Sequence, residues 1–105
     1  MIQVEFSVHD QVPAGFRISG HAGAGSAGRD VVCAAVSSAA YLAANTITDV
    51  IGVQPDLEVS DGLLRVAVSA ADRPKCGVIL RGLMMHLTQL AGQYPKNIHI
   101  TYTEV

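Results

Sequence analysis

One stretch of sequence is decisive for the predicted fold of this chain: Gly20-His21-Ala22-Gly23-Ala24-Gly25-Ser26-Ala27-Gly28-Arg29-Asp30-Val31-Val32-Cys33. The stretch joins an expected pair of strands to an expected long helix, and its glycines let the end of the second strand fold back onto the start of the helix. Asp30 is a favourable N-cap residue, which places Cys33 in the first helical turn.

Two strands are expected before this stretch. Residues 2–8 alternate between apolar and polar side chains, which is the pattern of a half-buried strand. The side chains expected on its buried face are Ile2, Val4, Phe6 and Val8. Residues 9–13 are expected to form a turn, and residues 14–19 a second strand that pairs with the first as a hairpin and carries Phe16 and Ile18 on one side.

A long helix is expected after it, over residues 31–51. The apolar residues that recur at helical spacing are Val32, Val36, Ala39, Ala43, Ile47 and Val50. Gly52 suits the position just after a helix end. Many of the remaining residues are small, which predicts close packing against several faces of this helix.

The C-terminal half predicts two more strands, a second helix and a last strand. Residues 56–60 and 63–69 are joined by Asp61-Gly62, a strong hairpin signal. The second helix begins near Asp72 and Pro74, and its apolar stripe is Ile79, Leu80, Leu83, Leu87 and Leu90. Residues 97–102 form the last strand. The order β-β-α-β-β-α-β predicts an α+β fold with two helices packed on one mixed β-sheet, in a single domain spanning residues 1–105.

The amino-acid composition indicates which partners and locations to expect for this protein. Only 15% of the 105 residues are charged, which predicts that part of the surface is hidden in an oligomer. The net charge is −2 and no cluster of Lys and Arg occurs, so a nucleic-acid partner is not expected. We expect no signal peptide and no segment apolar enough to span a membrane, and therefore a cytoplasmic protein. The two cysteines are expected to be free thiols.

Cys33 and His21 form the candidate catalytic pair. A thiolate is favoured at a helix N-terminus, and a nearby histidine can take the thiol proton and later return it to a leaving group. The alternatives are that Cys33 is a small buried hydrophobic residue and that His21 is an ordinary surface residue at a strand end. The pair flanks one glycine loop, which favours the catalytic interpretation.

Two further residues have a structural and a functional interpretation. Asp30 is expected to cap the helix, and its second role would be to orient His21, as the third member of a catalytic triad does. Ser37 lies four residues after Cys33 on the same helical face, so its hydroxyl can donate to the thiolate. Its alternative role is that of a small polar residue in a tightly packed helix.

Other site types are less well supported. Residues 23–28 satisfy G-x-G-x-x-G, but an antiparallel hairpin precedes the helix where a dinucleotide site needs the strand of a βαβ unit. The loop can still hold an anion at the helix N-terminus. Neither cysteine has a C-x-x-C partner, so no metal or other cofactor is expected. Cys76 is expected to pack in the core, and His9, His86 and His99 to lie in a turn, on a helix surface and in a strand.

The motif resembles the signature of the bacterial ribosomal-processing cysteine proteases, the Prp family. The matching residues are Gly20-His21-Ala22, Gly25, Gly28, Asp30-Val31-Val32-Cys33-Ala34 and Ser37. The resemblance implies a catalytic dyad of His21 and Cys33, a homodimer, and a mobile substrate loop that carries Gly23, Gly25 and Gly28. The implied reaction removes the N-terminal extension of the large-subunit ribosomal protein numbered twenty-seven during ribosome assembly. The alternative is a non-catalytic ribosome-assembly factor with an anion-binding glycine loop.

Overall fold

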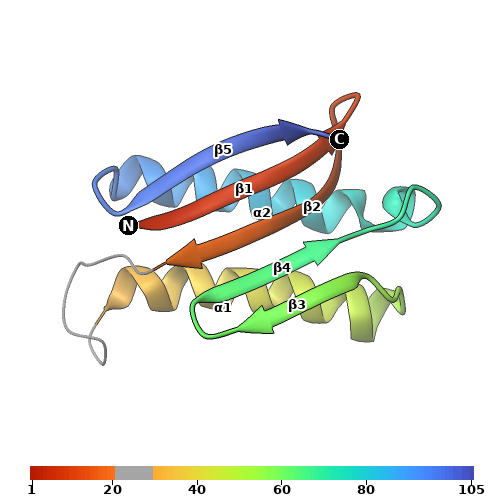
Figure 1. The fold of residues 1–105 in the computed structure, drawn as a ribbon, viewed down its shortest axis with the longest axis horizontal. Coiled ribbons are helices and arrows are strands. Elements are labelled where there is room, and N and C mark those ends of the chain that lie inside the picture. Colours follow the sequence, from red (N-terminus) through yellow and green to blue (C-terminus); the bar gives the residue numbers. More distant parts are fainter. Residues whose placement is uncertain (21–29) are drawn as a thin grey trace.

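The computed structural model describes residues 1–20 and 30–105, which form a sheet covered on one face by helices (Figure 1). The elements are β1 (Ile2–His9), β2 (Val12–Gly20), α1 (Val31–Asn45), the π-helical turn η2 (Thr46–Ile51), β3 (Asp56–Ser60), β4 (Leu63–Ala67), α2 (Arg73–Gln93) and β5 (Ile98–Glu104). The strand order is β3-β4-β2-β1-β5. Among the strands in the described residues, only β1 and β5 pair in parallel, so the sheet is mixed and the expected α+β fold is confirmed.

The turn between β1 and β2 is shorter than the sequence predicts. The two strands reach His9 and Val12, so only Asp10 and Gln11 lie between them. Both have positive φ, 48° and 68°, as in the two-residue turns whose twist matches that of the flanking strands. The pairing shifts between Ser7 and Val8, and Val8 beyond this irregularity is only half-buried.

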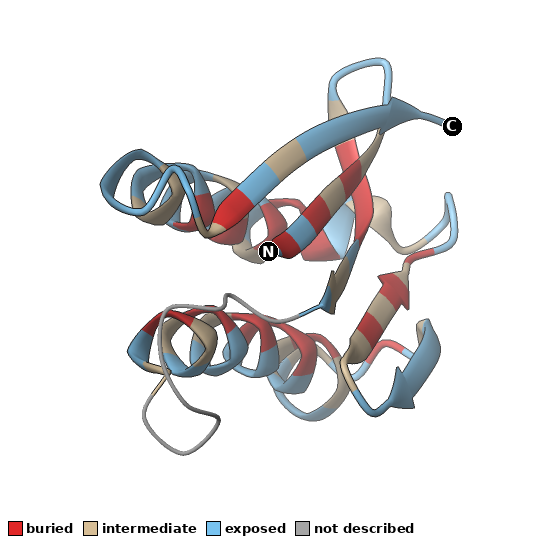
Figure 2. Cartoon of the chain, turned by 60° about the vertical axis from the view of Figure 1, so that its left-hand side comes forward, coloured by how far each residue is buried: buried red, intermediate tan, exposed pale blue. Residues whose placement is uncertain are grey.

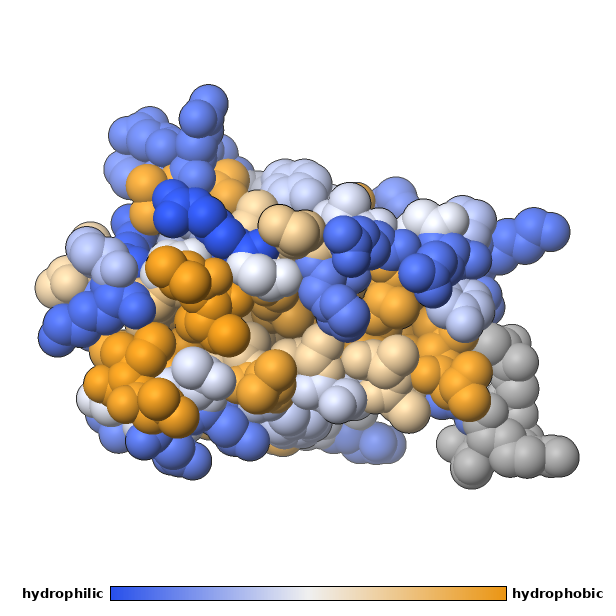
Figure 3. Space-filling model, turned by 180° about the vertical axis from the view of Figure 1, so that it is seen from behind, coloured by the Kyte–Doolittle hydropathy of each residue, from blue (hydrophilic) through white to orange (hydrophobic). Residues whose placement is uncertain are grey.

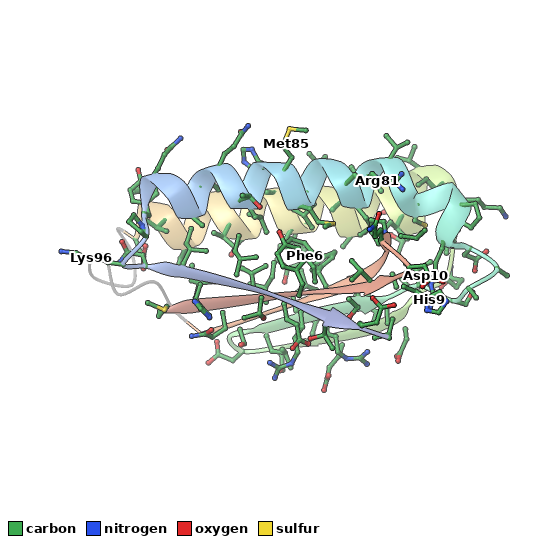
Figure 4. The ribbon with its side chains drawn as sticks, turned by 90° about the horizontal axis from the view of Figure 1, so that it is seen from above. Phe6, His9, Asp10, Arg81, Met85 and Lys96 are labelled. Atoms are coloured by element: carbon green, nitrogen blue, oxygen red, sulfur yellow. The ribbon has the colours of Figure 1, made fainter. Side chains whose placement is uncertain are left out.

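The core lies between the sheet and the two helices (Figure 2). Its fully buried large side chains include Phe6, Phe16, Ile47, Leu80 and Leu87. Phe6 points from β1 toward the helices, as Figure 4 shows. Cys76 is 0% exposed in this core, which confirms its packing role, and its burial raises the pKa of the thiol.

The first helix differs from the expected one in its last turns. The α-helical hydrogen bonding ends at Asn45, and the π-helical turn η2 follows as far as Ile51. A π-helix has more residues per turn than an α-helix, so side chains beyond this point leave the α-helical face. Val50, expected in the apolar stripe, is therefore 78% exposed, and Ala40 and Ala44 join Ala43 among the buried residues of the helix.

The expectation about apolar segments is wrong for this helical stretch. Val31–Ile51 is a 21-residue helix with a mean hydropathy of 1.5, long and apolar enough to cross a membrane by length and composition alone. In this fold its buried side chains belong to the same core as the sheet. Three of its alanines, Ala40, Ala43 and Ala44, are buried there.

The other element bounds need small corrections. β4 ends at Ala67, two residues earlier than expected, because the chain turns toward α2. Asp72 precedes α2 but makes no side-chain capping bond to it, and instead accepts a hydrogen bond from Ser69 Oγ at 3.1 Å. β5 extends to Glu104 because it pairs with β1 along nearly its whole length.

Candidate active site

Cys33 lies in the first turn of α1 and is held there by Asp30. The Oδ1 atom of Asp30 accepts a hydrogen bond from the Cys33 backbone N–H at 3.0 Å, so the expected N-cap is confirmed. The Asp30 carbonyl oxygen accepts from Ala34 N–H at 3.1 Å, which begins the helical ladder. The partly buried Cys33 side chain packs against the edge of the core.

Gly20 ends β2 in a conformation that suits only glycine. Its φ is +87°, and a Cβ there would lie 2.6 Å from the carbonyl oxygen of Met1. Its N–H donates to the Gly62 carbonyl oxygen at 3.0 Å, which ties the end of β2 to the turn between β3 and β4. His21 follows Gly20 directly in the sequence.

A pocket of about 190 Å³ joins these two positions. The residues that line it are Ile18, Gly20, Cys33, Ser37, Ala40, Tyr41, Ser60, Gly62, Leu63 and Leu64. Cys33, Ser37 and Tyr41 come from one face of α1, since they are spaced four residues apart. The structure therefore brings Cys33 and Ser37 to one pocket. It also places Gly20, the residue before His21, on the lining of the same pocket.

Several expected site residues lie outside the described part of the chain. They are His21, Gly23, Gly25 and Gly28. Asp30 and Gly20 border this segment, and both lie at or beside the pocket that contains Cys33. The two described residues that flank this segment are thus both close to the candidate nucleophile.

The remaining histidines belong to other parts of the molecule. His9 ends β1, where its Nδ1 lies 2.6 Å from the Val105 carbonyl oxygen, so it is a strand residue where a turn residue was expected. His86 is exposed on α2 and His99 is exposed on β5, as expected. No histidine within residues 1–20 and 30–105 lines the Cys33 pocket.

The pocket includes residues that sequence reasoning missed. Tyr41 lies two helical turns after Cys33, so its spacing alone could have identified it. Ser60 and Leu64 come from the β3–β4 hairpin, and only the tertiary fold brings them beside α1. Chemically, the arrangement places a thiol at a helix N-terminus, where thiolate is favoured, on the lining of a small pocket that has both polar and apolar residues.

Comparison with known proteins gives a consistent result. The model of the family described as "Cysteine protease Prp" matches residues 1–99. The ribosomal processing cysteine protease Prp of Staphylococcus aureus is 28% identical over 105 residues, covering 97% of this chain and 99% of that protein. The protein of the same name from Bacillus subtilis is 26% identical over 99 residues, covering 89% and 88%.

Solved structures resemble the fold closely. The S. aureus protease Prp with a covalently linked product peptide superposes with a TM-score of 0.91 at 26% identity, covering 98% of this chain and all of that one. The same protease with a substrate peptide gives a TM-score of 0.84 at 25% identity, with the same coverage.

Proposed function

This chain belongs to the Prp family of cysteine proteases, and on that premise we propose that it is an endopeptidase whose nucleophile is Cys33 and whose general base is His21. The observation that carries the proposal is the position of Cys33, in the first turn of α1 and on the lining of a pocket. Gly20, the residue that precedes His21 in the sequence, lines the same pocket as Cys33, which supports His21 as the base.

The reaction uses thiol and imidazole chemistry. His21 takes the proton of the Cys33 thiol, and the sulfur attacks the scissile carbonyl carbon. The tetrahedral intermediate collapses as the C–N bond breaks and His21 protonates the leaving amine. Water, deprotonated by His21, then attacks the thioester, which releases the carboxylic acid and restores the thiol.

The oxyanion needs backbone donors, and the helix cap restricts which amides supply them. The N–H of Cys33 already donates to the carboxylate of Asp30 at 3.0 Å. The donors are therefore other N–H groups of the helix start or of the glycine loop. A cap on the nucleophile's own amide also holds the first turn in place during the reaction.

We assign the N-terminal extension of the large-subunit ribosomal protein numbered twenty-seven as the substrate. The assignment is supported by the name that the S. aureus and B. subtilis relatives carry, ribosomal processing protease. Peptides bound to the S. aureus enzyme support an extended polypeptide as the substrate class. Maturation of a ribosomal protein takes place in the cytoplasm, which is the proposed location.

We also propose a homodimer that buries the outer face of the helices. Apolar side chains gather on this face, as Figure 3 shows, and an apolar groove of about 530 Å³ runs between α1 and α2. Residues on both of its walls are small, including Ala35, Ala39 and Gly82. Leu42 and Met85 nearby are 66% and 64% exposed in the single chain. Light scattering is expected to give twice the monomer mass of 11.0 kDa at micromolar concentration.

A peptide-cleavage assay tests the proposed function. The substrate is a synthetic peptide spanning the extension of the host's own ribosomal protein. Cys33→Ala should abolish cleavage without unfolding the protein, and Cys76→Ala, the matched control, should retain most of the activity. Cleavage by Cys33→Ala at the wild-type rate would refute the protease assignment. A wild-type protein that binds the peptide without cleaving it would favour the non-catalytic assembly factor.

A further inference from the structure

The edge strand β3 leads directly into the Cys33 pocket. In the described sheet β3 pairs only with β4, and its five residues are all exposed. Its last residue, Ser60, lines the pocket. The other edge strand, β5, lies at the opposite end of the strand order and contributes no residue to the pocket. An open edge beside a catalytic residue can pair with an extended peptide.

The apolar and the charged side chains of β3 lie on opposite faces of the sheet. Leu57 and Val59 are 48% and 54% exposed. Leu57 pairs with Val66 and Val59 with Leu64, so both point to the side of the sheet that the helices cover. Leu64 also lines the pocket. An apolar strip therefore continues from the pocket along β3.

The charged residues of β3 point to the opposite face. Arg65 donates to Asp56 Oδ2 and to Glu58 Oε1, both at 3.1 Å, and these two carboxylates raise the pKa of the Arg65 guanidinium. Because Arg65 pairs with Glu58 across the strands, this cluster lies on the sheet face away from the helices. The helix-side face of β3 thus presents no charge to an incoming chain.

The helix supplies the opposite wall. Tyr41 of α1 is 44% exposed and lines the pocket together with Ser60 and Leu64 of the hairpin. Its ring faces the same pocket as Cys33, two turns away on the helix. A side chain that enters the pocket can therefore contact both Tyr41 of α1 and Leu64 of β4.

We propose that the substrate docks as an extended strand on the open edge of β3, with its scissile carbonyl at Cys33. The occupant is a short uncharged peptide segment, and this inference rests on the proposed protease function. One apolar substrate side chain enters the pocket beside Tyr41. Because side chains of a strand alternate, two substrate residues spaced two apart contact Val59 and Leu57. A peptide is the expected occupant because the apolar strip runs on from the pocket along β3, as an extended chain would.

The first experiment changes the apolar strip on β3 and leaves the proposed catalytic residues unchanged. The double variant Leu57→Ser and Val59→Ser is compared with Val105→Ser, which alters a side chain that is 54% exposed just after β5, at the opposite edge of the sheet. The double variant should lower kcat/KM for the extension peptide roughly tenfold, mainly through KM, because apolar contacts with the substrate are lost. Val105→Ser should match the wild type. Alkylation of Cys33 by iodoacetamide should proceed equally in all three, since that reagent needs no docking strand.

The second experiment needs no protein variant. Amide-to-ester replacement removes single N–H donors along the peptide, and strand pairing predicts that every second replacement lowers kcat/KM. Uniform or absent effects along the peptide would overturn the docking strand.

The outcomes separate the docking strand from the protease function. A wild-type enzyme that cleaves the peptide while the double variant cleaves it equally well overturns the docking strand alone. A wild-type protein that cleaves no extension peptide overturns the protease function and the docking strand with it. A double variant that dissociates from dimer to monomer shows that β3 pairs with a second copy, which also contradicts the proposal.

Discussion

Replacing Asp30 separates its capping role from a catalytic one. Asp30→Asn keeps a side-chain oxygen that can accept the hydrogen bond from Cys33 N–H, now at 3.0 Å, whereas Asp30→Ala removes it. Losing an N-cap costs about 1 kcal/mol of folding stability. For a domain of 105 residues this corresponds to a fall in Tm of roughly 4 °C. We expect that fall for Asp30→Ala and almost none for Asp30→Asn, since the two residues cap about equally well.

The same two variants give different results in the cleavage assay. If Asp30 acts only as a cap, Asp30→Asn keeps kcat/KM near the wild-type value. If Asp30 also orients His21, Asp30→Asn should lower activity by up to about 10⁴-fold, as loss of the third triad member does in serine proteases. We expect the capping result. Removing the negative charge beside Cys33 should also favour the thiolate, so iodoacetamide should alkylate Asp30→Asn faster at low pH.

Two quantities are measured on the same samples: Tm, from thermal unfolding monitored by circular dichroism, and kcat/KM, from the peptide-cleavage assay. An unchanged Tm for Asp30→Ala would show that the cap contributes no stability, which contradicts the reasoning from the hydrogen bond. An intact Tm with a hundredfold loss of cleavage in Asp30→Asn would assign Asp30 to the catalytic machinery.

Three other predictions concern the surroundings of the site. Gly20→Ala should destabilise the protein by about 1–2 kcal/mol from its left-handed backbone alone, and an unchanged midpoint in urea would contradict this. Cys76 should resist iodoacetamide in the native protein at pH 8, because burial raises the pKa of its thiol. Mass spectrometry should therefore find one label, on Cys33, in the native protein and a second label only after denaturation. Replacing both Gly25 and Gly28 with Val should lower kcat/KM for the peptide far more than it slows alkylation of Cys33. The reason is that valine restricts the backbone and blocks close approach of the substrate. Equal losses in both assays would refute a role of these glycines in substrate binding.

Local patterns predicted most of the secondary structure. Alternating apolar residues identify β1, and Asp61-Gly62 identifies the β3–β4 hairpin, because strand period and turn chemistry depend on neighbours in the sequence. The cap at Asp30 was equally local, since the carboxylate and the amide that it accepts from are three residues apart. The motif around Cys33 led to the family for the same reason: its residues are contiguous in the chain.

Exceptions to these patterns arose where tertiary packing overrides local periodicity. The π-helical turn at Thr46–Ile51 exposes Val50, although its spacing from Ile47 suits an α-helical stripe. The β1–β2 turn closes over Asp10 and Gln11 alone, because strand pairing continues up to their neighbours.

The sequence by itself determined the order of the strands and of the two main helices, the helix cap and the residue that serves as candidate nucleophile. Only the tertiary structure decided the strand order, the parallel pairing of β1 with β5 and the composition of the pocket. Tyr41 could have been found by spacing, but Ser60 and Leu64 reach Cys33 only because β4 pairs with β2 beneath α1. The physical reason is that periodicity, capping and turn chemistry act between residues close in sequence. Sheet order and pocket walls depend instead on which distant apolar faces are buried together.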